Sequence, residues 1–349
     1  MNYLIISLAS GYGGSERTIE LIAEELAQEN QVTILAENDE HIERLTARKL
    51  NVINAEKGNS FSATFENCQH VVKNAVSSDV IITNTNKSAF ILALSRLLLT
   101  KINKRKSIIF VRDYQWKYKL IIRFLLRGSK FCVASRAVEK YVNDNFGTHP
   151  FIIPNPIETL HDNSENDKKY NTIMCPAMIS RWKGIEHLIA AMSMLPRHYK
   201  LKVIGKIADE NYFNELQEQV VQLNLSDSIQ FLPFEKDIAK YYQTCDVVVN
   251  TSVSQFGGPE TFGRTIIEAW QYAKPAIAFS CGGPKFLINN GSDGLLVEEG
   301  NNVALAESIL SLLEDDTKRK SMGIAGLKRA QYEFSLDEIT RILNDVIAA

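Results

Sequence analysis

Two glutamates with seven residues between them stand on either side of a loop-to-helix passage in the second half of the chain. Glu260 lies in a loop rich in glycine and proline, and a helix is expected to begin near Gly263, which places Glu268 two turns inside it. The first turn of a helix presents backbone N–H groups and the positive end of the helix dipole, which together bind phosphate. A phosphate site between two carboxylates suits a ligand with hydroxyl groups at both ends, such as a nucleotide sugar.

A second interpretation of these glutamates needs no ligand. Glu268 is four residues after Arg264, a spacing at which the two side chains pair on a helix surface. Glu260 would then be a solvated loop residue.

Short apolar runs alternate with helical patterns along the first part of the chain. The run over residues 3–8 is followed by a glycine-containing loop, a helical pattern and a second apolar run over residues 31–36. Runs that are apolar on both faces are typical of buried parallel strands, and their alternation with helices predicts a doubly wound α/β domain. Further runs of this kind cover residues 80–83, 107–111 and 130–134.

Two prolines, Pro154 and Pro156, mark a boundary, because they can continue neither a helix nor a central strand. The same alternation starts again at residue 172. We therefore predict a first domain over residues 1–155 and a second Rossmann-like, doubly wound domain over residues 156–335. The last helix, within residues 336–349, is expected to pack back on the first domain.

Open α/β sheets bind their ligands at the carboxyl ends of their strands. Two such domains in one chain are therefore expected to face each other across a cleft, with the functional residues in the loops that follow the strands. These loops cover residues 10–15, 112–118, 177–184, 233–237, 251–263 and 281–283.

The composition excludes several classes of protein. With 349 residues, 45% of them hydrophobic and 23% charged, the chain is neither disordered nor collagen-like. Its five cysteines are dispersed and form no C-x-x-C pair, which argues against a zinc site or a disulfide framework and fits a cytoplasmic protein. The longest apolar stretch, residues 89–99, falls short of the roughly 20 residues that a membrane span needs.

The passage around the two glutamates resembles the E-x7-E signature of retaining glycosyltransferases of family 4, which have the GT-B fold of two Rossmann-like domains. Other landmarks of that family occur in the same order along nearly the whole chain. They are Gly13-Gly14-Ser15-Glu16, Val133-Ala134-Ser135-Arg136-Ala137-Val138, Ile153-Pro154-Asn155, Trp182-Lys183-Gly184, Cys245-Asp246-Val247, Cys281-Gly282-Gly283-Pro284 and Asp293-Gly294-Leu295-Leu296-Val297.

The resemblance implies a role for each matching residue. Glu268 corresponds to the glutamate that binds the nucleotide ribose, and Glu260 to the one beside the transferred sugar. Lys183 corresponds to the lysine that neutralises the donor diphosphate, a role that suits a compact cation because the leaving diphosphate gains negative charge. Gly14 would let the backbone approach a phosphate closely.

The resemblance also implies the remaining donor contacts and the reaction type. A sugar would move from a UDP- or GDP-sugar to a glycan acceptor with retention, without a protein nucleophile. We expect no essential metal and no other cofactor, because no Asp-x-Asp motif occurs at a strand end and a helix terminus with Lys183 can replace a divalent ion. The further donor-binding candidates are Phe234, near which the base would be recognised, and Phe262, Gly263, Arg264 and Thr265 at the helix start.

The chain departs from the family pattern in two places. Met178 stands where the family usually has an arginine that contacts the diphosphate, so Arg181 either takes over that contact or is a surface residue. Where many members have a His-Asp pair, this chain has Arg112 and Asp113, which puts the histidine's role in doubt. Arg112 could instead attract an anionic group of the acceptor or donor. We count Arg112 and Asp113 with Glu260 and Lys183 as candidate catalytic residues.

The first part of the chain is cationic and the rest is anionic. Residues 1–160 contain 20 Lys and Arg against 16 Asp and Glu, and the eleven basic residues between 96 and 130 face a single acid, Asp113. Apolar residues interleave with these cations, most clearly over residues 114–131, as in a helix that binds a membrane surface. The alternative is a solvated cationic face over an ordinary core helix.

The membrane interpretation fits an acceptor anchored on a lipid diphosphate in the inner leaflet, as in the assembly of bacterial surface polysaccharides such as lipopolysaccharide O-antigen, capsule or exopolysaccharide. It places the protein in the cytoplasm as a peripheral membrane protein. Nucleic acid is not expected as a partner, because no recognised binding motif accompanies the basic residues.

Three other functions remain open. An NAD-dependent oxidoreductase is suggested by Gly11 and Gly13 after the first strand and by Glu37 after the second, but Glu16 stands where the third glycine is needed. A sugar-nucleotide epimerase would share the fold without the reaction. A non-catalytic protein that binds sugar nucleotides stays possible because of the departures at Arg112 and Met178.

Overall fold

The computed structural model describes residues 1–158, 169–235 and 237–349. The chain divides into two compact units: a first unit of residues 1–158 with 335–349, and a second unit of residues 159–334. Each unit has a parallel sheet and a core of its own. The change of unit falls close to the predicted boundary at residue 155.

The first unit has a seven-stranded sheet in which every neighbouring pair is parallel, in the order β3-β2-β1-β4-β5-β6-β7. The strand order reverses between β1 and β4, so the crevice at their carboxyl ends is the expected ligand site of such a sheet. The strands are β1 (Asn2–Ser7), β2 (Gln31–Ala36), β3 (Asn51–Asn54), β4 (Val80–Thr83), β5 (Lys106–Val111), β6 (Lys130–Val133) and β7 (Phe151–Ile152).

Helices cover both faces of this sheet, which is why its strands are apolar throughout. Leu4 and Ile6 of β1 pack with α3, α4, α5 and α6 on one face, and Tyr3 and Ile5 pack with α1 and α14 on the other. The helical elements are α1 (Gly14–Ala27), α2 (Asp39–Ala47), α3 (Phe61–Ala75), α4 (Asn86–Leu98), η1 (Thr100–Lys104), α5 (Lys119–Leu125), η2 (Arg136–Val138), α6 (Glu139–Phe146) and α14 (Leu336–Ala348).

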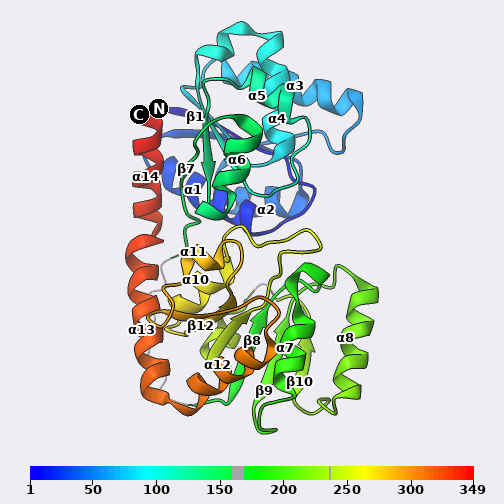
Figure 1. Ribbon diagram of the computed structural model, residues 1–349. Helices are drawn as coiled ribbons and strands as arrows, with labels where there is room; N and C mark the ends of the chain where they lie inside the picture. Colours follow the sequence, from blue (N-terminus) through cyan, green and yellow to red (C-terminus); the bar gives the residue numbers. More distant parts are fainter. Residues whose placement is uncertain (159–168, 236) are drawn as a thin grey trace. The chain divides into compact units, whose positions relative to one another are not determined.

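The C-terminal helix α14 belongs to the first unit, where it lies against α1 (Figure 1). The Ser335 hydroxyl caps its start by accepting the backbone N–H of Glu338. At its end, the ammonium groups of Lys106 and Lys130 donate to backbone carbonyls of α14. Cations at this end are favourable because the carbonyls there carry the negative end of the helix dipole.

The second unit repeats the architecture with six parallel strands in the order β10-β9-β8-β11-β12-β13. Here the order reverses between β8 and β11. The prediction of two doubly wound, parallel-sheet α/β domains is therefore confirmed. The strands are β8 (Thr172–Pro176), β9 (Lys200–Ile204), β10 (Ile229–Leu232), β11 (Val247–Asn250), β12 (Ala276–Phe279) and β13 (Gly294–Val297).

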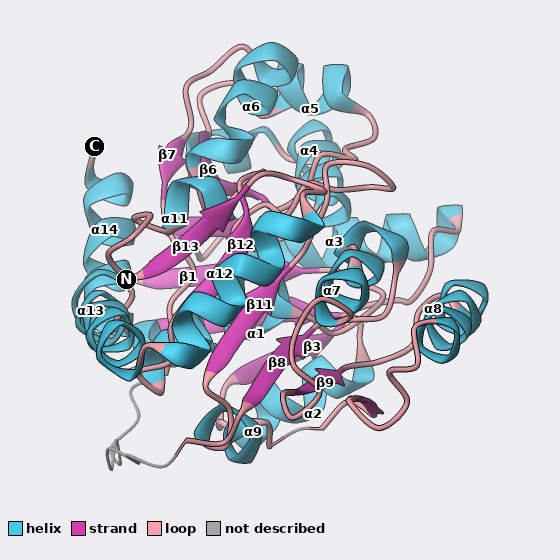
Figure 2. Cartoon of the chain, turned by 60° about the horizontal axis from the view of Figure 1, so that its bottom comes forward, coloured by secondary structure: helices cyan, strands magenta, loops and turns pink. Residues whose placement is uncertain are grey.

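This second sheet is also covered on both sides. Ile173 and Cys175 of β8 pack with α7, α8 and α12 on one face, whereas Met174 packs with α9 and α10 on the other; Figure 2 shows α7 and α12 over the strands. The helical elements are η3 (Arg181–Lys183), α7 (Ile185–Met192), α8 (Glu210–Gln222), α9 (Ala239–Gln243), α10 (Arg264–Gln271), α11 (Pro284–Leu287), α12 (Asn302–Glu314) and α13 (Asp316–Glu333).

The basic stretch differs from its prediction in two respects. The amphipathic helix expected over residues 114–131 is limited to α5, because Tyr118 has a left-handed φ of 55° and Trp116 is buried against Phe146. Arg96 is buried rather than exposed on a surface. Its guanidinium donates to the hydroxyls of Ser107 and Ser129 and to a backbone carbonyl. Over the described ranges, no helix has the length and hydrophobicity to cross a bilayer.

Candidate functional site

The reversal point of the second sheet brings together two of the candidate catalytic residues. Lys183 follows β8 and Glu260 follows β11, and these neighbouring parallel strands end at the same edge. The Lys183 ammonium lies 2.5 Å from a carboxylate oxygen of Glu260, with the two side chains only 13% and 17% exposed. A cation and an anion thus meet at the place where this fold binds ligands.

Backbone contacts hold the turn that carries Lys183. The N–H of Val253 donates to the carbonyl of Trp182 at 2.9 Å, and the Thr251 hydroxyl donates to the carbonyl of Lys183 at 3.0 Å. Gly184 ends the turn with φ of 57°, and a Cβ atom there would lie 2.3 Å from the carbonyl oxygen of Thr251. Only glycine combines that conformation with so close an approach, so Lys183 is fixed against the loop after β11.

A second close approach fixes the backbone of Glu260. The N–H of Gly283 donates to the Glu260 carbonyl at 2.6 Å. A Cβ atom on Gly282, whose φ is 56°, would lie 2.2 Å from that same oxygen. The loop after β12 therefore packs directly on the loop after β11, and the Cys-Gly-Gly-Pro landmark is explained by this contact.

A hydroxyl and an aromatic ring lie beside the pair. The Ser252 hydroxyl lies 3.5 Å from the Glu260 carboxylate, and the Lys183 ammonium lies 3.7 Å from the centroid of the Trp182 ring. The neighbouring Cys281 thiol donates to the backbone carbonyl of Ser252, and burial, with the negative charges of Glu299 and Glu260, raises its pKa to about 12. This thiol stays protonated at neutral pH.

Helix α10 begins directly after the loop of Glu260. Gly263 precedes its first residue with φ of 99°, and the hydroxyl of Thr265 accepts a hydrogen bond from the Asn250 amide at 3.3 Å. Phe262 is buried against Phe334, so only its backbone can contribute to a site. The helix has eight residues, and in its first turn the N–H of Ile266 donates to the carbonyl of Gly263 at 3.0 Å.

Glu268 is held by two partners, one of which sequence reasoning missed. Its carboxylate accepts from the Arg264 guanidinium at 2.8 Å, as the alternative interpretation expected, and from the Tyr242 hydroxyl at 3.0 Å. Tyr242 is buried in α9, stacked on Tyr272. Burial and the Glu268 charge raise the pKa of Tyr242, so it is a donor to Glu268. A carboxylate has about four acceptor directions, so these bonds leave capacity for ligand hydroxyls.

Two donor-binding candidates stand apart from the pair. The Arg181 guanidinium faces α8, where it pairs with Glu215, lies 3.7 Å from Asp209 and covers the Tyr212 ring. Arg181 therefore lies in the same turn as Lys183 but is directed elsewhere. Phe234 follows β10 and is 58% exposed.

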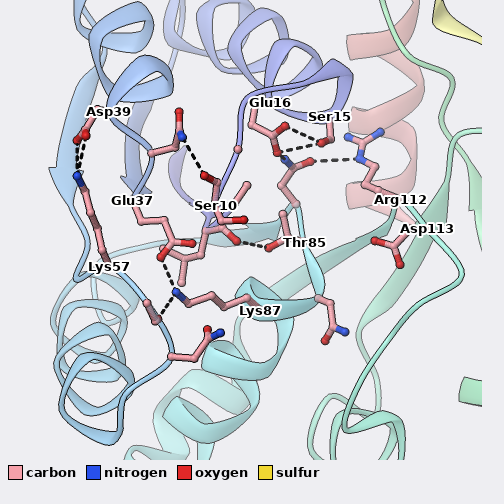
Figure 3. A pocket seen from close by; sticks show the side chains of 18 residues that line it. Ser10, Ser15, Glu16, Glu37, Asp39, Lys57, Thr85, Lys87, Arg112 and Asp113 are labelled. Carbon is pink, nitrogen blue, oxygen red and sulfur yellow. Dashed lines mark hydrogen bonds and ion pairs between the residues drawn. The ribbon is translucent and has the colours of Figure 1, made fainter. Parts of the chain in front are cut away.

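The first unit has a cavity of about 580 Å³ at its own reversal point. Arg112 and Asp113 line it after β5, as Figure 3 shows. The Arg112 guanidinium donates to Asn84 at 3.1 Å and to Asn155 at 2.8 Å, and lies over the Phe110 ring. Arg112 is thus held in place by two amide oxygens.

Among the polar residues of this cavity, the sequence analysis missed Lys87, and it named Glu16 and Glu37 only as part of a family landmark and of the oxidoreductase alternative. The buried Glu16 carboxylate accepts from Ser15 at 2.9 Å, and the buried Glu37 pairs with Lys87, the ammonium of which points at Glu37 in Figure 3. Lys87 could have been predicted as a site residue, because it lies in the first turn of α4, directly after the loop that follows the apolar strand β4. Gly14 begins α1 beside Ser15.

The structure therefore brings together Lys183 with Glu260, and Arg264 with Glu268, whereas Gly14, Arg112 and Asp113 belong to the first unit. Among the described residues, no group of three or more His, Cys, Asp or Glu is arranged to hold a metal ion.

Comparison with known proteins places the chain in context. Residues 156–329 match the family model described as "Glycosyl transferases group 1". The amylovoran biosynthesis glycosyltransferase AmsD of Erwinia amylovora is 23% identical, and the alignment covers 99% of this chain and 98% of that protein. The capsular polysaccharide biosynthesis glycosyltransferase CapM of Staphylococcus aureus is 27% identical over 50% of this chain and 47% of CapM. AmsD aside, the chain spans about half the length of these curated relatives.

Solved structures share the whole fold. Anabaena Alr3699/HepE in complex with UDP-glucose has a TM-score of 0.86 at 22% identity, and the match covers 100% of both chains. A glycosyltransferase from Rickettsia africae ESF-5 has a TM-score of 0.84 at 23% identity, covering 99% of this chain and 98% of that one. The fold is GT-B, as the sequence predicted.

Proposed function

Through residues 156–329 this chain belongs to the glycosyl transferases group 1 family, and from that premise we propose that it transfers a sugar from a nucleoside-diphosphate donor to a glycan acceptor. The observation that carries the proposal is the Lys183–Glu260 ion pair at the reversal point of the second sheet, beside the start of α10. Cation, carboxylate and helix terminus are the groups that a sugar diphosphate needs.

In the proposed reaction, Lys183 changes partner when the donor binds. The diphosphate takes the ammonium from Glu260, and the N–H groups of the first turn of α10 bind the same phosphates. Glu260 then accepts hydrogen bonds from hydroxyls of the transferred sugar, while Glu268, oriented by Arg264 and Tyr242, accepts from the ribose. Lys183 stabilises the negative charge that develops on the leaving diphosphate.

We propose retention of the anomeric configuration, with the leaving phosphate assisting deprotonation of the acceptor on the same face of the sugar. The protonated Cys281 thiol beside Glu260 is unsuited to act as a nucleophile. Lys183 and the helix terminus supply the positive charge in this scheme, which therefore needs no divalent ion. Activity that survives chelation of metals would support this part.

The donor proposed here is a UDP-sugar, with a GDP-sugar as the alternative. HepE, which has the same fold, is described in complexes with UDP and with UDP-glucose. The exposed Phe234 ring follows β10, where a base could stack on it.

The acceptor is proposed to be lipid-linked and to be presented at the inner face of the cytoplasmic membrane. Relatives named for capsular polysaccharide, lipopolysaccharide core and amylovoran biosynthesis favour an acceptor of bacterial surface polysaccharide assembly. The cavity of the first unit, with Arg112 and Asp113, would receive the acceptor end.

Release of UDP from UDP-sugars by the purified protein, with and without lipid-linked acceptor extracts, tests the proposal. We expect Lys183→Ala and Glu260→Ala to lose turnover, whereas Arg181→Ala retains most of it because Arg181 is held on α8. Equal turnover of Lys183→Ala and the unmodified protein would refute the assignment of the diphosphate site. Donor binding without turnover would favour the non-catalytic alternative.

A further inference from the structure

A second cavity of the first unit, of about 720 Å³, lies away from the carboxyl ends of the strands. It is at the opposite edge, beside the first residues of β6 and β7, and α5 forms one of its walls. We call it the α5 cavity. Its lining residues are Leu120, Arg123, Phe124, Leu126, Arg127, Gly128, Ser129, Lys130, Phe131, Phe146, Gly147, Thr148, His149 and Phe151.

The α5 cavity has an unbalanced charge. Arg123, Arg127 and Lys130 line it together with His149, and its described lining residues include no aspartate or glutamate. The Arg123 guanidinium packs over Gly147, where a Cβ atom would lie 2.7 Å from its nearest nitrogen. The Lys130 ammonium is bonded to a carbonyl of α14, so Arg123 and Arg127 supply most of the positive charge that an anion entering the cavity would neutralise.

The outer surface of α5 is apolar as well as cationic. Leu120 is 78% exposed and Phe124 is 77% exposed, although Ile122 of the same helix and Leu126 directly after it already pack in the core. Leu120, Arg123 and Phe124 follow the spacing of one helix stripe, and Arg127 lies in the turn directly after α5. Large apolar side chains that remain exposed in a cluster indicate an interaction surface.

We propose that the α5 cavity binds the phosphate headgroup of an anionic phospholipid, with Leu120 and Phe124 inserted at the boundary of the acyl chains. This inference deepens the proposed function, because it names the surface by which the protein binds the membrane. It rests on the proposed function for the premise that the protein acts at a bilayer. The ligand must offer a negative charge next to an apolar body, which is the chemistry of a lipid surface. A second copy of this chain would bring the same cations against each other, so it does not fit.

The test is co-sedimentation of the purified full-length protein with phosphatidylcholine vesicles that contain or lack phosphatidylglycerol. We expect binding only with the anionic lipid, and weaker binding at high salt. Arg123→Ala/Arg127→Ala should lower the partition coefficient roughly 25-fold, about fivefold for each cation. Leu120→Ser/Phe124→Ser should lower it by at least about tenfold although every cation remains.

A matched control carries the same kinds of change on another helix. Lys328 and Tyr332 of α13 are an exposed cation and an exposed aromatic residue one turn apart, so Lys328→Ala/Tyr332→Ser should bind vesicles as the unmodified protein does. Since the side chains of Leu120 and Phe124 project from the surface, their replacement leaves the core intact. If thermal unfolding nevertheless shows that the apolar double variant is destabilised, Phe124→Ser alone serves in its place.

Three results would overturn the inference: equal binding to vesicles without phosphatidylglycerol, unchanged binding of Arg123→Ala/Arg127→Ala, or full binding of Leu120→Ser/Phe124→Ser. Titration with UDP in the absence of vesicles separates this failure from a failure of the transfer proposal. The α5 variants should bind UDP normally, whereas a protein that binds vesicles but no nucleotide would leave the α5 cavity supported and the donor site refuted.

Discussion

Replacing Glu260 by glutamine should tighten the binding of a nucleoside diphosphate while it slows sugar transfer. In the structure the ammonium of Lys183 is already engaged by Glu260, so an incoming diphosphate has to compete with a carboxylate for it. Glutamine keeps the shape of the side chain but removes the competing charge. The two properties should therefore change in opposite directions.

The size of the effect follows from the geometry of the pair. Unit charges 2.5 Å apart attract by roughly 6–7 kcal/mol at an effective dielectric constant of about 20, but desolvation offsets most of this. Hydrogen bonds between charged groups contribute about 1.5–3 kcal/mol net. Because both side chains retain some exposure, we take the lower end, and a gain of about 1.5 kcal/mol corresponds to roughly tenfold tighter binding.

Isothermal titration with UDP, or with GDP if that is the donor nucleotide, measures this effect. The titrations would compare the unmodified protein, Glu260→Gln, Lys183→Ala and the double variant. We expect Lys183→Ala to weaken binding, and the gain from Glu260→Gln to shrink when Lys183 is absent. Glu298→Gln is the matched control, since Glu298 is an exposed carboxylate in the loop after β13. Weaker nucleotide binding by Glu260→Gln would refute the competition between carboxylate and diphosphate.

Three further predictions concern the supports of the site and of the first unit. Tyr242→Phe keeps the ring stacked on Tyr272 but removes a hydrogen bond to Glu268, so donor affinity should fall about three- to tenfold while the unfolding temperature stays the same. An unaltered donor affinity in a titration would exclude this positioning role. Gly282→Ala should lower stability by about 1–3 kcal/mol and reduce turnover, because its Cβ would collide with the Glu260 carbonyl; denaturant unfolding with unchanged midpoint would contradict the close approach. For the buried Glu20, burial alone would raise the pKa, but hydrogen bonds and charges from His41 and Arg44 outweigh it and lower the pKa below its usual 4.5. The contribution of Glu20 to stability is therefore present above that value and lost as the pH falls through the folded-state pKa. Glu20→Gln should be less stable than the unmodified protein at neutral pH, and its free energy of unfolding should change less as the pH falls. An equal pH dependence of the unfolding free energy in the two proteins would refute this.

Candidate site residues could be predicted best where they come directly after a strand in the sequence. The loops that contain Lys183 and Glu260 could be predicted as ligand-binding loops because both come after apolar runs, and the carboxyl ends of neighbouring parallel strands meet; the ion pair between the two side chains was not predicted. Their adjacency depends on β8 lying next to β11, which the family pattern implied. The start of α10 at Gly263 followed in the same way from local turn and helix signals.

Residues whose role depends on distant partners could not be predicted. Tyr242 meets Glu268 across 26 positions, and Arg112 meets Asn84 and Asn155 across 28 and 43. The direction of Arg181 toward Glu215 on α8 is likewise a tertiary contact without a local signal. The count of basic residues also overestimated how many of them lie on the surface. A cation such as Arg96 can be buried when a carbonyl and hydroxyls accept its hydrogen bonds.

The measurement that tests the central claim most directly is a thermal-shift titration of the purified protein with UDP, GDP, ADP, CMP and NAD, first without metal and then with magnesium. A ligand that binds only the native state stabilises it by about 2.7 kcal/mol at a hundredfold excess over Kd. We predict a clear shift with one nucleoside diphosphate, UDP before GDP, that magnesium does not change and that Lys183→Ala abolishes. A shift with NAD alone, or none with any of the five, would contradict a nucleotide-sugar site at Lys183 and Glu260.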